Sequence, residues 1–153
     1  MAVISRLQDR PLLPAAELEA FLDGRTDDGA VVSFTGVARR SSHGGDEVST
    51  LYLEHYPGMT ERSIEAIAEA GAARFKVSDV LVIHRCGEIS PGEAIVFVAT
   101  ASRHRGEAFA AADYVMDRLK TEAAFWKRED GAGGSRWIEP TAVDLDRRAR
   151  WSD

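Results

Sequence analysis

Two lysines with an aromatic segment between them are the residues of this chain best suited to chemistry. The stretch from Lys120 to Glu129 reads KTEAAFWKRE. Phe125 and Trp126 therefore lie just before the second lysine, Lys127. An amine held against apolar surface is partly desolvated, which lowers its pKa and makes it useful as an acid, a nucleophile or an anchor for an anion. The alternative is structural, with lysine stems covering a core aromatic where a helix runs into an edge strand.

Further basic residues fall at the ends of the expected elements. Arginine donates to phosphate in a bidentate manner, and a helix N-terminus offers unpaired backbone N–H groups to anions. A single cluster of this kind is more often merely solvated, but five of them in an acidic chain favour a shared anion pocket. The five positions are Arg39 with Arg40, His84 with Arg85, Arg103 with His104 and Arg105, Lys120, and Lys127 with Arg128.

Length and composition indicate one domain with an ordinary core. The chain has 153 residues, 44% of them hydrophobic, and a formal net charge of -6, which disfavours nucleic acid as a partner. Its single cysteine, Cys86, excludes an intrachain disulfide and is expected to be a small core residue. No apolar run is long enough for a signal peptide or a membrane span, so we expect a cytoplasmic protein.

Several common kinds of site are not indicated. The sequence has no Gly-rich phosphate loop followed by Lys-Ser/Thr, no dinucleotide fingerprint and no Gly-x-Ser-x-Gly nucleophile elbow. None of the four histidines has a histidine partner three or four residues away, which disfavours a metal site. We therefore expect neither a resident metal nor a cofactor.

The pattern of elements predicts an α+β domain in which helices cover a largely antiparallel sheet. Ser102 is expected to cap the third helix, and Phe109, Ala112, Met116 and Leu119 to form its apolar stripe. The predicted strands are 3–7, 30–36, 50–56, 77–84, 94–100 and a hairpin formed by a strand ending near 129 and one at 136–138. The predicted helices are 14–22, 60–75 and one ending at 120, with an exposed loop at 41–46 and a charged tail from about 141.

The length of the third helix constrains any shared pocket. If residues 105–120 form one helix, its ends lie about 22 Å apart at ~1.5 Å per residue. One small ligand cannot touch both ends within a single chain. Either one basic cluster lies outside the site, or two copies meet and each supplies one end of the helix. We favour the second arrangement.

Several long stretches resemble the large, catalytic subunit of molybdopterin synthase, the MoaE family, over nearly the whole chain. The stretches are DGAVVSFTG at 28–36, LEHYPGMTE at 53–61, MDRLKT at 116–121 and FWKRE at 125–129, together with VIHR at 82–85, GE at 87–88, PGE at 91–93 and IVFV at 95–98. The resemblance implies a single α/β hammerhead domain spanning residues 1–153.

The resemblance also implies an activity and partners. Members of this family convert cyclic pyranopterin monophosphate into molybdopterin by installing two sulfurs as a dithiolene. The sulfur arrives as a thiocarboxylate at the Gly-Gly C-terminus of a small ubiquitin-like subunit, and two large subunits form the homodimeric core of a heterotetramer. This chain ends in Arg-Trp-Ser-Asp, so we expect it to receive sulfur from the small subunit.

Matching positions in this chain give the expected site. Lys120 and Lys127 correspond to the family's two active-site lysines. The expected substrate-binding residues are Arg39, His104, Arg105, Arg128 and Glu129. The chain departs from the family at Val37, where a lysine is frequent, and at Ala124, where proline is common.

Two other interpretations remain. One is a non-catalytic module that binds a pterin or a phosphate, and the other is a structural dimer that docks a ubiquitin-like tail. Cys86 is not expected to carry sulfur as a persulfide.

Overall fold

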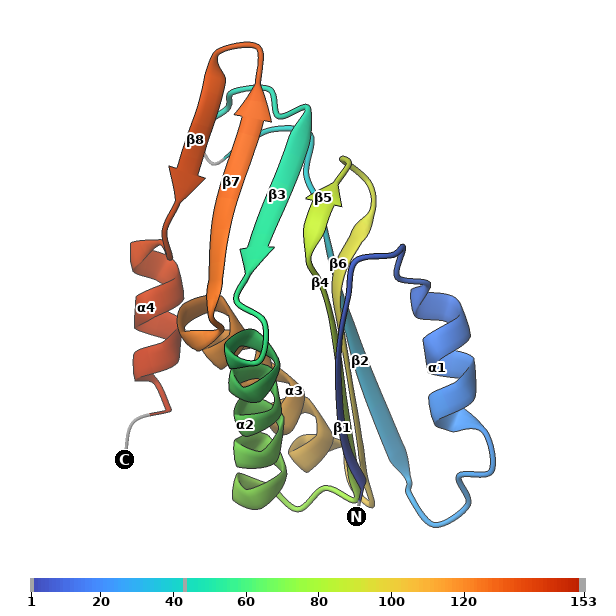
Figure 1. Ribbon diagram of the computed structural model, residues 1–153. Helices are drawn as coiled ribbons and strands as arrows, with labels where there is room; N and C mark the ends of the chain where they lie inside the picture. Colours follow the sequence, from blue (N-terminus) through green and yellow to red (C-terminus); the bar gives the residue numbers. More distant parts are fainter. Residues whose placement is uncertain (1, 43, 152–153) are drawn as a thin grey trace.

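The computed structural model describes residues 2–42 and 44–151, so His43 of the expected loop and the terminal Ser152 and Asp153 lie outside it. Across the described residues the chain forms two four-stranded sheets and four helices (Figure 1). The strands are β1 (Ala2–Gln8), β2 (Ala30–Val37), β3 (Thr50–His55), β4 (Asp79–Arg85), β5 (Gly87–Ile89), β6 (Ala94–Ser102), β7 (Phe125–Gly131) and β8 (Gly134–Ile138). The helices are α1 (Pro14–Leu22), α2 (Met59–Arg74), α3 (Arg105–Glu122) and α4 (Ala142–Ala149).

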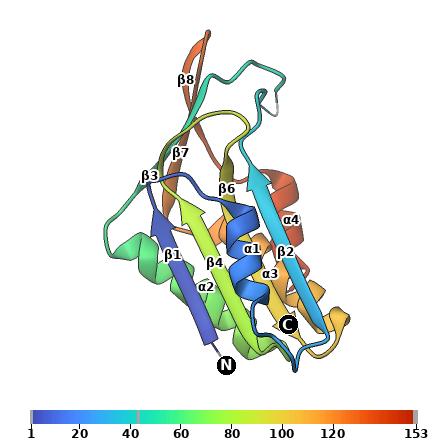
Figure 2. The ribbon, with the colours of Figure 1, turned by 90° about the vertical axis from the view of Figure 1, so that its right-hand side faces the viewer.

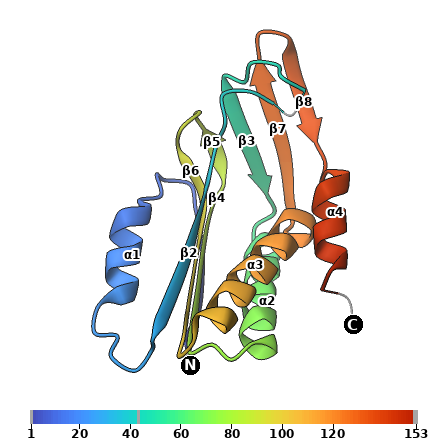
Figure 3. The ribbon, with the colours of Figure 1, turned by 180° about the vertical axis from the view of Figure 1, so that it is seen from behind.

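The first sheet has the strand order β1-β4-β6-β2 and is antiparallel except for the β1–β4 pair. Helix α1 covers one face of it, and α2 and α3 cover the other, as the views from opposite sides show (Figures 1 and 3). Figure 2 looks onto the α1 face, where that helix crosses the sheet.

The central strand β4 is buried on both faces, which explains its continuous apolar run. Successive side chains of a strand point to opposite faces. Val80 and Val82 therefore belong to the core cluster under α2 and α3, whereas Leu81 and Ile83 pack with Leu12 in the α1 cluster. One strand thus contributes to both halves of the core, and His84 lies near its C-terminal end.

Helices α2 and α3 pack closely because α2 carries a glycine at their contact. A Cβ atom on Gly71 would lie 2.6 Å from a methyl carbon of Val115, closer than real contacts allow. The small residues Ala68, Ala111 and Ala112 are also buried there. This contact fixes α3, and with it Lys120 in the last turn of that helix.

The second sheet has the order β5-β3-β7-β8 and is antiparallel throughout. It extends beyond the end of the first sheet (Figure 1). The β3–β7 ladder sets Leu53 opposite Lys127, and Leu53 belongs to a small core with Leu51 and Ile89. The side chain of Lys127 therefore lies beside an apolar cluster, which is the environment expected from its sequence neighbours.

Helix α4 gives the predicted charged tail an ordered structure. The Thr141 hydroxyl accepts a hydrogen bond from the Asp144 N–H (3.1 Å), and the Asp144 carboxylate accepts one from the Thr141 N–H (3.0 Å). Such a capping box starts the helix. Arg147 and Arg150 then donate to Asp117 on α3, which holds α4 against that helix.

The α+β class, the hairpin and the order of the predicted elements are confirmed. The single expected sheet is instead two, because β3, β7, β8 and the three-residue β5 pair among themselves and with no strand of the first sheet. Ser102 does not cap α3: it ends β6, its hydroxyl donates to the Lys76 carbonyl, and His104 is the N-cap residue. Phe109 is 60% exposed and lies outside the buried stripe of α3.

No helix in the described ranges, 2–42 and 44–151, is both long and apolar enough to cross a membrane.

Candidate active site

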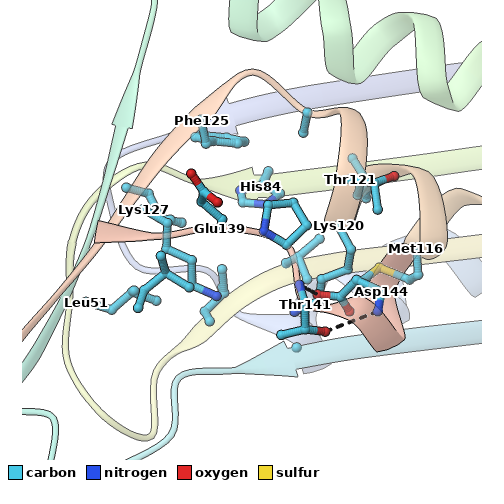
Figure 4. A pocket seen from close by; sticks show the side chains of 18 of the residues that line it. Leu51, His84, Met116, Lys120, Thr121, Phe125, Lys127, Glu139, Thr141 and Asp144 are labelled. Carbon is cyan, nitrogen blue, oxygen red and sulfur yellow. Dashed lines mark hydrogen bonds between the residues drawn. The ribbon is translucent and has the colours of Figure 1, made fainter. Parts of the chain in front are cut away.

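A cavity of about 400 Å³ lies where the two sheets meet the C-terminal end of α3 (Figure 4). Its walls come from six strands, from α3, and from the segment that leads into α4 together with the first turn of that helix. The apolar lining includes Phe34, Leu51, Leu53, Met116, Leu119 and Phe125. The polar lining includes Arg39, His84, Lys120, Thr121, Lys127, Glu139, Thr141 and Asp144. A concave site with apolar walls and a few convergent polar groups is typical of small-molecule binding.

The two lysines singled out from the sequence both line this cavity. They are two of only three lysines in the chain. Lys120 arrives from the last turn of α3 and Lys127 from the third position of β7. The loop between them is tied to α2, because the Thr60 hydroxyl donates to the Ala124 carbonyl (2.6 Å) and the Ala124 N–H donates to Ser63 (3.1 Å). A helix end and a strand start are thus held at a fixed separation.

Arg39 completes a group of three cations at the cavity. Among the described residues, none of the three has an ion-pair or hydrogen-bond partner for its side chain. Arginines elsewhere behave differently, since Arg25 and Arg85 both pair with carboxylates. Three positive groups converge on one apolar-walled space, and none of them forms an ion pair with the carboxylates Glu139 and Asp144 of the lining, which favours an anionic ligand.

The electrostatics of Lys127 follow from this arrangement. Burial, and then the neighbouring charge of Lys120, lowers the pKa of Lys127 below its ordinary 10.5. Glu129 and Asp144 act in the opposite direction, and their effect is smaller. An ammonium group that is disfavoured by its surroundings gains more from an incoming anion than a solvated one would.

His84 lies in the same cavity; it was one of the five basic positions expected at a shared anion pocket, but the resemblance did not imply it as a site residue. Its ring stacks on Phe125 with centroids 4.3 Å apart, and its Nδ1 lies 2.7 Å from the Arg85 carbonyl oxygen. Burial, followed by the charges of Lys120 and Lys127, lowers the pKa of His84 to about 4. The sequence signal was present, because His84 ends the predicted strand 77–84, but its role as a neutral ring in a cationic cavity required the fold.

His104 and Arg105 lie at the other end of α3 and do not line the cavity. The single helix from Arg105 to Glu122 confirms the helix on which the length argument depends. Neither end of this helix can reach a ligand held at the other end within one chain, a separation of about 22 Å.

Arg128 and Glu129 also lie outside the cavity lining. The Arg128 guanidinium donates to Asp130 and lies 4.9 Å from the centre of the Tyr52 ring. Glu129 accepts a hydrogen bond from Arg136 on β8. Both side chains therefore brace the β3–β7–β8 ladder that carries Lys127.

Val37 and Ala124, the two departures from the family pattern, occupy different places. Val37 lines the cavity and is half exposed. The neighbouring Arg40 is not part of the lining, so it does not supply there the basic group that a lysine at position 37 would give. Ala124 supplies the N–H that bonds Ser63, a donor that proline lacks.

The fold and the cavity define a class: an α+β protein in which three cations, unpaired among the described residues, and aromatic walls surround one cavity, an arrangement that favours an anionic small molecule. Comparison with known proteins gives the particular family. The MoaE protein family matches residues 7–122, and the chain belongs to this family.

The relatives agree over nearly the full length. The chain is 50% identical to the molybdopterin synthase catalytic subunit of Caulobacter vibrioides over 97% of each chain. The solved molybdopterin biosynthesis MoaE protein of Burkholderia ambifaria has a TM-score of 0.78 and 43% identity, covering 99% of this chain and 98% of that one. A Helicobacter pylori structure, a complex of subunits 1 and 2 of molybdopterin-converting factor, has a TM-score of 0.71 at 17% identity, covers 89% of this chain and 90% of that one, and shows the fold alone. By its family the chain is an enzyme of molybdenum-cofactor biosynthesis that converts cyclic pyranopterin monophosphate to molybdopterin.

Proposed function

We propose that the cavity transfers sulfur from the C-terminal thiocarboxylate of a small ubiquitin-like subunit to cyclic pyranopterin monophosphate, forming the dithiolene of molybdopterin. The convergence of Lys120, Lys127 and Arg39, all without partners in the described chain, is the observation that carries the proposal. Both reactants are anionic, and the apolar walls suit a flat heterocycle. The lining contains no nucleophilic thiol, because the single cysteine, Cys86, is not part of it.

The two lysines take different roles. Lys120 neutralises the carboxyl end of the sulfur carrier and the charge that develops on its carbonyl oxygen as sulfur leaves. Lys127 and Arg39 hold the cyclic phosphate and the pterin, and they assist opening of the phosphate ring. The lowered pKa of Lys127 supports its place beside the substrate, because a partly desolvated ammonium is stabilised by a phosphate.

The site is completed by a second copy of this chain. His104 and Arg105 would enter from the neighbouring subunit, which agrees with their distance from Lys120 along α3. Phe34 on β2 and Phe109 on α3 are 41% and 60% exposed, which suits an interface on this side of the molecule. Two such subunits form the core of a heterotetramer in this proposal, with a small subunit at each end. The Helicobacter pylori complex of two subunits has the same fold and is consistent with a small partner.

Arg128 and Glu129, which were expected to bind substrate, do not line the cavity. Their contacts lie within the second sheet, with Asp130, Tyr52 and Arg136. We infer that they act through the strand that places Lys127.

A reducing cytoplasmic setting suits this chemistry, since a thiocarboxylate must survive until it reaches the cavity. The single thiol is not needed for it. Burial raises the pKa of Cys86, which keeps the thiol protonated and unreactive.

The test is a reaction of the purified protein with a thiocarboxylated small subunit and cyclic pyranopterin monophosphate. We expect a dithiolene product and the loss of one thiocarboxylate for each sulfur installed. Binding of the pterin phosphate without product would favour the non-catalytic module. Binding of the carrier tail without affinity for the pterin phosphate would favour the docking dimer.

A further inference from the structure

His84 occupies a position that the proposed roles of the lysines leave unused. It is the sixth residue of β4, it is 8% exposed, and it lines the cavity together with Lys120 and Lys127. Every strand residue before it from Val80 to Ile83 belongs to the core. A histidine at the point where a buried strand opens into a cationic cavity therefore needs its own explanation.

The hydrogen bond of Nδ1 decides what the other ring nitrogen offers. The partner of Nδ1 is the Arg85 carbonyl oxygen at 2.7 Å, and a carbonyl oxygen only accepts. Nδ1 therefore carries the hydrogen and donates it. In a neutral imidazole the remaining nitrogen, Nε2, is then an acceptor.

Nε2 is presented to the cavity. It has no hydrogen-bond partner among the described residues. Across those residues the only buried side-chain nitrogen or oxygen without a partner is Nε of Arg85, so Nε2 of His84 is reached by solvent. The cavity that His84 lines provides that access.

The ring is held in place and kept neutral. Stacking on Phe125, with planes 25° apart, fixes its orientation across the junction of the two sheets. Burial and the two lysines, with charges from α3 and β7, lower the pKa of His84 to about 4. At neutral pH the ring therefore remains an acceptor and adds no charge.

The cavity otherwise offers mainly donors or full charges. Arg39, Lys120 and Lys127 only donate, whereas the two carboxylates of the lining, Glu139 and Asp144, are charged acceptors, and Asp144 is also used in the capping box with Thr141. Cyclic pyranopterin monophosphate carries the ring and exocyclic N–H groups of its pterin in addition to its anionic phosphate. Those groups need acceptors, and a neutral one does not compete with the phosphate for the lysines.

We propose that His84 is a substrate-contacting specificity residue whose Nε2 accepts a hydrogen bond from an N–H group of the pterin. This inference rests on the proposed function, because it concerns the same cavity and the same substrate. It assigns recognition of the heterocycle to His84 and recognition of the phosphate to the cations. The two parts of the substrate are then separable by mutation.

The test compares H84Q with H84M, two side chains of similar length that differ in the presence of a strong acceptor. We expect the affinity for cyclic pyranopterin monophosphate to fall about tenfold in H84M and to stay within about threefold of wild type in H84Q. Affinity for inorganic phosphate, measured by competition, should be unchanged in both. Equal pterin affinity in H84M and wild type overturns the inference, as does a parallel loss of pterin and phosphate affinity, which indicates a packing role.

A measurement on the wild-type protein removes the dependence on variant folding. With ¹⁵N-labelled histidine, the unprotonated nitrogen of His84 should shift upfield when the pterin binds, while Nδ1 stays protonated. An unchanged Nε2 resonance at saturation contradicts the proposal. Wild-type turnover is scored separately: a protein that forms dithiolene but shows neither effect loses this inference alone, whereas a protein without turnover loses the proposed function.

Discussion

His84 and Phe125 stack across the junction of the two sheets, with ring centroids 4.3 Å apart. The first residue belongs to β4 of one sheet and the second begins β7 of the other. Lys127 follows Phe125 by two residues and so projects from the same face of β7. This contact sets the position of the second lysine relative to the first sheet, and the cavity exists because both sheets end there.

Replacing Lys127 with alanine should weaken binding of cyclic pyranopterin monophosphate by about tenfold or more, because a desolvated cation is removed from a phosphate site. Lys76 provides the matched control, since it is the third lysine, is exposed and does not line the cavity. Titration of the pterin into both variants checks this. Equal weakening in K76A and K127A would show that only the overall charge matters.

The charged Lys127 side chain should also lower the free energy of unfolding. Its pKa is lowered, chiefly by burial and then by Lys120, so between its folded-state pKa and 10.5 the unfolded chain binds more protons than the folded one. The free energy of unfolding should therefore rise with pH through that window. K127M should be more stable than wild type near pH 7, by about 1 kcal/mol, and should lack this part of the slope. Urea unfolding at several pH values measures it, and a less stable K127M contradicts the description of the site.

Asp117 should anchor α4 to α3. Its buried carboxylate accepts hydrogen bonds from Trp151 (2.7 Å), Arg150 (2.7 Å) and Arg147 (3.1 Å). We expect D117N to lower the free energy of unfolding by about 2 kcal/mol, a value reduced from that of a fully buried pair because both arginines are partly exposed. The control is D113N, which removes a more exposed partner of the same two arginines and should cost less than about 1 kcal/mol. Similar losses in the two variants would show that burial at Asp117 is irrelevant.

The same carboxylate predicts a pH dependence. Desolvation alone would raise the pKa of Asp117, but the donors from Trp151, Arg150 and Arg147 outweigh it, and the pKa is lowered from 3.8. Its contribution to stability is therefore complete above 3.8 and is lost as the pH falls through the lower folded-state value. D117N should lack this acid-limb loss when unfolding is followed from pH 5 downward.

The composite site predicts complementation between inactive variants. If Lys120 of one subunit works with Arg105 of the other, a mixed dimer of K120A and R105A contains one intact site and one doubly altered site. Random mixing of equal amounts should restore about a quarter of wild-type activity, because half the dimers are mixed and each has one working site of two. Activity assays after co-refolding measure this recovery. Recovery that stays at the level of the separate variants would place the whole site within one chain.

Much of this arrangement was predictable from the sequence, because local signals are strong where single elements carry them. Pro14 and the run from Val80 to Ile83 marked a helix start and an interior strand, and the structure agrees. The aromatic residues beside Lys127 predicted its desolvation. These inferences depend only on neighbours in the chain.

The features that could not be predicted depend on contacts between residues that are distant in the sequence. The short β5 pairs with β3 instead of continuing β4, a choice set by the turn at Gly87 with its φ of 83° and by contacts distant in sequence. The exposure of Phe109 and the neutrality of His84 likewise follow from what surrounds them. Local periodicity contains no information on either.

We expect the Lys120 ammonium to assist departure of sulfur from the carrier. The most direct measurement is single-turnover mass spectrometry of the carrier and the pterin, with wild type, K120A and K76A mixed with thiocarboxylated small subunit and cyclic pyranopterin monophosphate. We predict that wild type and K76A convert two thiocarboxylates to carboxylates for each dithiolene formed, while K120A forms no dithiolene and keeps the dimeric mass of wild type. Dithiolene formation by K120A at the rate of K76A would contradict the account.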